Sequence, residues 1–128
     1  MDESGFVIPP TIENDEQNKK IYTNALEQMK SLYKSMTDAG IPGEDARFIL
    51  PNACKTNIVM TMNLRELSEV SKVRMCNKAQ WEIKELFQLL KKEVLSVEPF
   101  LGTFMKAKCK YLGHCPEIES CGKMSKKN

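Results

Sequence analysis

One short segment of this 128-residue chain, KTNIVMTM at residues 55–62, alternates between two sets of side chains as a β-strand does. One set is Thr56, Ile58, Met60 and Met62, and the other is Asn57, Val59 and Thr61. A lone strand leaves its backbone N–H and C=O groups unpaired, so it needs partner strands. Because only residues 6–8 also have strand character, we expect the partners to come from another polypeptide, another copy or a larger fold.

The rest of the chain has helical periodicity. Apolar side chains recur at three- and four-residue steps over residues 15–38, which Gly40 ends as a C-cap, and over residues 77–97. A short helix is expected in PGEDARFIL, and another over residues 100–108 before a cysteine-containing tail, 109–128. Asn63 and Asn77, each followed three residues later by Glu66 or Gln80, predict capped helix starts. The sequence thus predicts an α+β fold, a mainly helical fragment around one strand, in a single domain over residues 1–128.

The charge and the ends of the chain point to a cytoplasmic protein. A formal net charge of +2 does not indicate nucleic acid or an anionic membrane as a partner. No apolar run approaches the ~20 residues that span a bilayer. The acidic start, MDESGFVIPP, has no apolar signal core. Five cysteines without a signal peptide are typical of the reducing cytosol, where thiols stay free.

Three of the cysteines are evenly spaced in the tail, in CKYLGHCPEIESC, with His114 among them. Structural zinc sites usually pair ligands two to four residues apart, whereas five residues separate each neighbouring pair in this tail. We therefore predict no metal site. Cys115 adjoins His114, but nothing in the pattern marks them as a nucleophile and its base.

Arginine is rare in this chain, where it accounts for three of the 19 basic residues. Its planar fork of donors suits phosphates, carboxylates and flat polar rings, although chance in a lysine-rich composition is the alternative. At about 100° per residue, Arg74 lies in line with Asn63, Leu67 and Val70, on the face that should be apolar. It must therefore snorkel out at the helix end, pair with a carboxylate or face a ligand.

The other two arginines have simple alternatives as well. Arg65 and Glu69 are four residues apart and could form a surface ion pair. Arg47 follows Glu44 and Asp45, which could neutralise it.

Two segments, GIPGEDARFILP and MNLRELSEVSKVRMCNKAQWEI, together resemble the C-terminal half of the flavin-dependent thymidylate synthases. The resemblance rests on an ARxxLP element, an NxR helix start, an arginine nine residues further on, and AQWEI, all in this order. It implies the fold of that family and the reductive methylation of dUMP to dTMP. Methylenetetrahydrofolate, FAD and NADPH would take part, in a homotetramer with shared active sites. This family uses no cysteine nucleophile, in line with the absence of an activated cysteine.

The resemblance also implies roles for four residues. Arg47 in DARFILP corresponds to an arginine that binds the nucleotide. Asn63 and Arg65 in NLR correspond to positions that contact the flavin. Arg74 corresponds to the arginine that grips the uracil and favours its ionised form. A fixed cation beside a ring nitrogen does lower the cost of removing that nitrogen's proton.

Two departures from the family pattern qualify the resemblance. The Arg-His-Arg flavin signature is missing, since the only histidine is His114 and no arginine precedes Arg47. Glu69 stands where a neutral polar side chain or a histidine is usual. We therefore expect the chain to supply the nucleotide-binding and activating half of such an enzyme, with dUMP as ligand and either a separate N-terminal half or other copies as partners. The alternatives are a truncated or inactive paralogue that binds nucleotide and oligomerises without redox catalysis, and a structural protein with a metal-binding tail.

Overall fold

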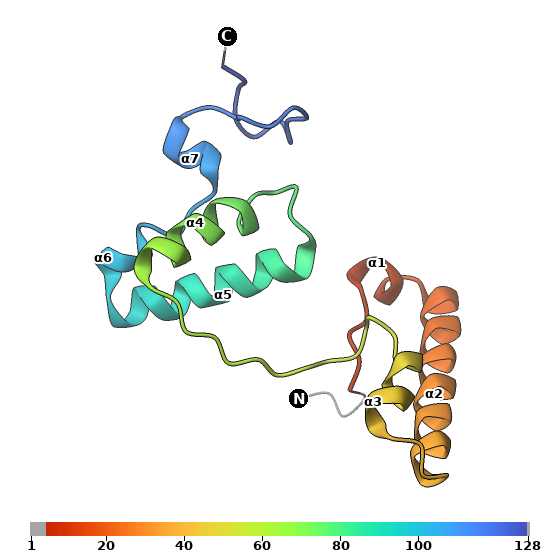
Figure 1. Cartoon of the computed structure of the whole chain (residues 1–128). Coiled ribbons are helices and arrows are strands. Elements are labelled where there is room, and N and C mark those ends of the chain that lie inside the picture. The colour runs from red at the N-terminus through yellow and green to blue at the C-terminus, as the bar shows by residue number, and fades with distance from the viewer. Residues whose placement is uncertain (1–4, 128) are drawn as a thin grey trace. The chain divides into compact units, whose positions relative to one another are not determined.

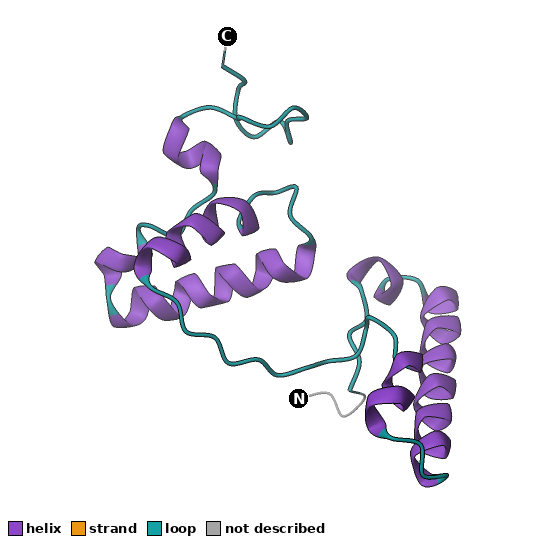
Figure 2. Ribbon diagram, in the orientation of Figure 1, coloured by secondary structure: helices purple, strands orange, loops and turns teal. Residues whose placement is uncertain are grey.

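The structure is a computed structural model that describes residues 5–127. The chain forms two compact units, Met1–Val59 and Met60–Asn128. Figures 1 and 2 show that both units are built from helices joined by loops. Each unit buries apolar side chains of its own: Phe6, Leu26 and Ala46 in the first unit, and Phe87 and Met105 in the second.

Helix α2, Glu16–Asp38, is the longest helix of the first unit, and both of its ends follow the sequence prediction. The Asp15 side chain accepts hydrogen bonds from the backbone N–H groups of Gln17 and Asn18, which caps the first turn. At the other end Gly40 has a φ of 85°, and its N–H donates to the carbonyl of Thr37 while Ile41 donates to Met36. This is a Schellman motif, whose left-handed residue favours glycine.

The remaining elements of the first unit are short. The chain enters through an extended segment, in which Val7 N–H donates to Ala53 O at 2.8 Å and Val7 O accepts from Tyr22 Oη at 3.1 Å. Phe6 also forms an isolated antiparallel bridge with Cys54. The unit further contains α1, Pro10–Glu13, then α3, Gly43–Ala46, and a 3-10 helix, Arg47–Ile49, which together form the short helical stretch expected in PGEDARFIL.

The predicted strand over residues 55–62 does not form, and the described part of the chain contains no strand. Within residues 5–127, the last backbone hydrogen bond of this pairing runs from Lys55 N–H to Gly5 O, where the predicted strand should begin. Ile58, Val59 and Met60 are 72%, 98% and 57% exposed. Alternation alone cannot hold a strand without a neighbouring ladder. The helical part of the fold prediction is therefore confirmed, whereas the α+β assignment is not.

The second unit is a small helical assembly. Helix α4 packs against both α5 and α7, and α5 packs against α6 (Figure 1). The helix expected over residues 100–108 is instead two separate short helices, because the buried residues Met105 and Ala107 lie in a non-helical stretch between them. The bounds are Leu64–Arg74 for α4, Trp81–Val97 for α5, Pro99–Gly102 for α6 and Lys108–Leu112 for α7.

The start of α5 differs from the prediction. Gln80 is the N-cap, and its Oε1 accepts from Ile83 N–H at 3.0 Å. Asn77 caps no helix. Its Oδ1 accepts from Lys84 Nζ at 2.7 Å, and its Nδ2 donates to Cys121 Sγ at 3.7 Å. The amide that resembled a cap in the sequence thus links α5 to the tail.

After α7 the tail is a loop, as predicted, and a few backbone contacts hold it. Cys115 is buried, and its N–H donates to Ser125 O at 2.8 Å, next to a parallel bridge between Cys115 and Lys126. Lys126 Nζ also donates to Ile118 O at 2.6 Å. Among residues 5–127, no helix has the length and apolar character needed to cross a membrane.

Gly102 provides a test of the packing between α5 and α6. A Cβ at this buried position would overlap the Leu95 side chain and lie 3.4 Å from Leu95 Cα. We expect Gly102→Ala to lower the free energy of unfolding by about 1–3 kcal/mol, because overpacking forces neighbouring side chains and backbone to shift. Urea denaturation followed by circular dichroism measures the change.

The matched control is Gly43→Ala, at the start of α3. Its Cβ would meet only Tyr33 Oη, at 3.7 Å, which is an ordinary contact. Equal denaturation midpoints for the two variants would contradict close packing at Gly102.

Candidate functional site

Helix α4 carries three of the four predicted site residues, and a capping box fixes its start. Asn63 Oδ1 accepts from Glu66 N–H at 2.9 Å, and Glu66 Oε2 accepts from Asn63 N–H at 3.2 Å. The predicted capping box is thus confirmed. Because Asn63 fixes the first turn, it also sets the direction in which Arg65 and Arg74 leave the helix.

Arg74 is the last residue of α4 and is exposed to solvent. The buried face of α4 is centred on Ser71, which is fully buried, whereas Val70 is 37% exposed. Arg74 therefore lies at the border of the packed face, where its charged group stays in solvent. Among residues 5–127, its guanidinium takes part in no ion pair or hydrogen bond, so the carboxylate partner considered from the sequence is not found. A cation at this end is stabilised by the helix dipole.

Arg65 leaves α4 on the opposite side from Arg74, because nine residues at about 100° each amount to a half turn beyond two full ones. It is also exposed, and the ion pair with Glu69 that their spacing allows does not form. Glu69 pairs with Lys72 instead, at 2.5 Å, which leaves Arg65 without an ionic partner in the described chain. Asn63 and Arg74 do share one face, but about 16 Å of helix axis separates them.

Arg47 belongs to the first unit, where it begins the 3-10 helix that follows α3. Its side chain is exposed. Neither Glu44 nor Asp45 forms an ion pair with it, and the described residues offer it no other carboxylate. All three arginines are therefore exposed, and none has an ionic partner within residues 5–127.

Comparison with known families places these positions within the match to one family model. A family model described as "Thymidylate synthase complementing protein" matches residues 1–100. The chain belongs to this family. The match covers both units as far as α6 and includes Arg47, Asn63, Arg65 and Arg74.

Curated relatives within the family are named flavin-dependent thymidylate synthase. The chain is similar to that of Pyrococcus abyssi (strain GE5 / Orsay), with 41% identity over 121 residues that cover 91% of this chain and 50% of the relative. Identity to the Geobacter sulfurreducens protein is 37% over 118 residues, again 91% of this chain and 50% of the relative. The chain spans about half the length of these curated relatives.

The name of these relatives implies a flavin, and the donors on α4 fit an anionic, hydrogen-bonding group. The Arg65 guanidinium is exposed and unpaired in the described chain. Asn63 uses its oxygen in the capping box, whereas its side-chain N–H groups have no partner among residues 5–127. Glu69 lies one turn from Arg65, but Lys72 neutralises part of its charge.

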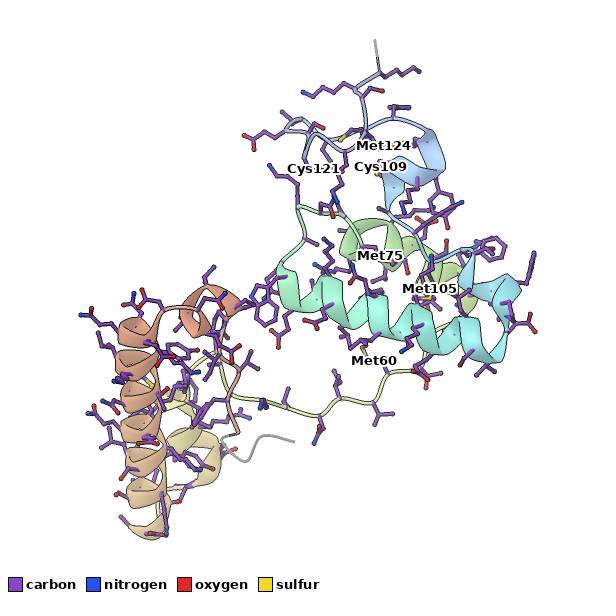
Figure 3. The ribbon with its side chains drawn as sticks, turned by 180° about the vertical axis from the view of Figure 1, so that it is seen from behind. Met60, Met75, Met105, Cys109, Cys121 and Met124 are labelled. Carbon is purple, nitrogen blue, oxygen red and sulfur yellow. The ribbon has the colours of Figure 1, made fainter. Side chains whose placement is uncertain are left out.

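The second unit also contains a cavity of about 390 Å³ that the sequence did not predict. Its wall is formed by the end of α4, the loop into α5, one side of α5, the segment from Met105 through the start of α7, and the tail. Figure 3 shows Cys109, Cys121 and Met124 of this wall gathered near α7. None of the four predicted site residues lines it. No cluster of metal-ligating side chains occurs within residues 5–127.

Cys121 is an exposed thiol of this wall with a distinctive environment. The backbone N–H of Lys123, followed by the side-chain amide of Asn77, stabilises its thiolate and lowers the pKa of the Cys121 thiol. The positive charge of Lys123 acts in the same direction, with a smaller effect. Asn77 is 44 residues away in the chain, so sequence spacing could not show its contribution.

The capping box predicts how substitutions at Asn63 change stability. Asn63→Ala removes the acceptor for Glu66 N–H, so we expect a loss of about 1 kcal/mol in the free energy of unfolding. Asn63→Asp keeps an acceptor and adds a negative charge at the helix N-terminus, so it should unfold at the wild-type denaturant concentration or above. Chemical denaturation of the three proteins measures this order, and an unaltered Asn63→Ala midpoint would show that the box contributes nothing.

A pH prediction follows for Cys121. The lowered pKa gives more thiolate at a given pH, and Asn77→Ala removes one of its causes, so the pKa should rise towards its ordinary value. Alkylation of Cys121 by iodoacetamide at mildly alkaline pH should then slow, as followed by mass spectrometry. Cys54 in the first unit is an internal reference whose rate should not change. Unchanged alkylation of Cys121 would rule out the contribution of Asn77.

Proposed function

We propose that this chain acts in flavin-dependent thymidylate synthesis, the reductive methylation of dUMP to dTMP, and supplies the nucleotide-binding and activating half of the site. Methylenetetrahydrofolate would provide the one-carbon group, and NADPH the reducing equivalents. Bound FAD would pass those reducing equivalents to the substrate. A cytoplasmic location agrees with this role and stays a prediction.

The observation that carries the proposal is the state of Arg74 in a chain that belongs to this family. Its guanidinium is exposed and has no ionic partner within residues 5–127. The resemblance implies that this position corresponds to the uracil-gripping arginine. A guanidinium beside the uracil ring would stabilise the negative charge that forms when the ring nitrogen loses its proton. Arg47 would bind the same nucleotide, and Asn63 and Arg65 would bind the flavin.

The directions of the α4 side chains support a site shared between copies. Arg65 and Arg74 leave opposite sides of one helix, so a flavin at Arg65 and a uracil at Arg74 of the same copy would lie on opposite sides of α4. Apolar side chains exposed on the second unit, among them Leu89, Val97 and Phe100, could be covered by further subunits. We propose a homo-oligomer, a tetramer as in the family, or association with an N-terminal half. In either assembly, residues 55–62 would pair with a neighbouring strand and complete an α+β fold within one domain of the family.

One observation favours a second candidate, a paralogue that binds nucleotide and oligomerises without redox catalysis. The Glu69 side chain is 63% exposed and lies one turn from Arg65. A negative charge there would repel the diphosphate of a flavin dinucleotide, even with Lys72 nearby. The two candidates share dUMP binding and differ in flavin binding.

A pair of substitutions separates the two ligands. We expect Arg74→Ala to weaken dUMP binding at least about tenfold, because a hydrogen bond to a charged group contributes about 1.5–3 kcal/mol. Arg65→Ala removes the same charge from the same helix, so it serves as the matched control, with dUMP affinity retained and FAD affinity lowered. Isothermal titration calorimetry measures dUMP binding, and flavin absorbance measures FAD.

Two results of these titrations would count against the proposal in different ways. Equal dUMP affinity in wild type and Arg74→Ala would refute the nucleotide assignment. Full dUMP binding by a wild-type protein that takes up no FAD would favour the non-redox paralogue.

A further inference from the structure

The cavity of the second unit has a wall rich in lysine. Twenty residues line it, less than a sixth of the chain, yet eight of them are lysines, half of all the lysines present. They come from α4, the loop before α5, α5 itself, the segment around α7, and the tail. A lysine-rich composition alone would place two or three in a wall of this size, so tertiary folding has concentrated them.

Few carboxylates compensate this charge. Glu117 is the one acidic residue of the wall. Two of the lysines form ion pairs with glutamates that do not line the cavity: Lys72 with Glu69, and Lys78 with Glu119 at 2.9 Å. Eight positive charges less these three negative ones leave five. Like charges around one concave space raise its potential and attract counter-ions.

Neutral groups hold several of these ammonium groups in place without cancelling their charge. Lys84 Nζ donates to Asn77 Oδ1 at 2.7 Å, and Lys91 Nζ donates to Met105 O at 2.8 Å. Both lysines are only partly exposed. Each ammonium has three donors, so two remain for a ligand.

The Tyr111 ring holds two more of the wall's lysines. Its centroid lies 4.4 Å from Lys106 Nζ and 5.0 Å from Lys72 Nζ, both within range of a cation–π interaction. The Tyr111 hydroxyl in turn hydrogen-bonds Phe104 O and the Ser68 hydroxyl, which fixes the ring. Cations that are oriented in advance lose less freedom when an anion binds.

We propose that this cavity is a binding site for a small, multiply charged oxyanion, bearing phosphate or carboxylate groups, and that it is separate from the Asn63, Arg65 and Arg74 positions of α4. Five uncompensated charges match a ligand with several negative charges better than a monoanion. The cavity volume of about 390 Å³ admits such a molecule. This inference does not depend on the activity proposed above, since none of that site's residues lines the cavity.

Calorimetric titration of the full chain at low salt tests the proposal. Inorganic tripolyphosphate probes the phosphate source and citrate the carboxylate source. We expect at least one of them to bind with one site per chain, and to bind more weakly as sodium chloride is added. Which of the two binds more tightly identifies the charged group. If neither binds, the proposal is overturned.

Substitutions locate the bound anion. Lys84→Gln with Lys91→Gln should weaken binding about tenfold or more. Lys108→Gln with Lys110→Gln should also weaken binding. We expect this second variant to fold like the wild type, because both lysines are exposed and their side chains make no hydrogen bond or ion pair in the described chain. Circular dichroism checks that each variant is folded.

The matched control is Lys30→Gln with Lys34→Gln, an equal change of charge on α2 of the first unit. It should leave the affinity unchanged. An equal loss in this control would mean that only net charge matters, which would refute the site. If Arg74→Ala alone abolished tripolyphosphate binding, the anion would lie on α4 and the cavity assignment would fall, whatever happened to dUMP binding.

Discussion

The reciprocal hydrogen bonds between Asn63 and Glu66 determine the geometry of the second unit's candidate residues. They fix the residue at which α4 begins, and the helical repeat then fixes every later direction. If α4 began one residue later, the directions of all its side chains would rotate by about 100°. Ser71 would then leave the packed interface, and Arg74 would turn with it. The cap thus couples local stability to the placement of two charged groups on opposite faces.

Arginine and lysine have different positions in this unit. Arg65 and Arg74 are on α4, outside the cavity, and make no ion pair within residues 5–127. Half of the lysines surround a cavity, where an amide, a carbonyl and an aromatic ring orient them. A planar guanidinium suits recognition of a flat ring or a single phosphate, whereas several ammonium groups around one cavity suit a small, multiply charged anion. The two sets therefore suit different ligands, even though Arg74 and Lys72 both lie in the last turn of α4.

Features set by nearby residues could be predicted from the sequence. Asp15, Gly40 and Asn63 end or begin helices as their local patterns indicate, because each acts on backbone groups within four residues. The strand expected over residues 55–62 does not form within residues 5–127, because a ladder needs a neighbour, which alternation does not supply. The prediction that Asn77 caps a helix was wrong. Its side-chain oxygen and nitrogen instead hydrogen-bond distant partners, on α5 and in the tail.

The lysine-lined cavity illustrates what no local pattern reveals. Its lysines span residues 72–123, and no motif or periodicity joins them. Tyr111 could not be predicted as their organiser, since its ring meets Lys72 only after α7 packs on α4. The candidate residues of α4 differ from these lysines, because they belong to a local sequence pattern that resembles the family. Their opposed directions then impose a condition that resemblance alone did not: any active site that uses both Arg65 and Arg74 needs more than one copy of α4, or two separate ligands on one copy.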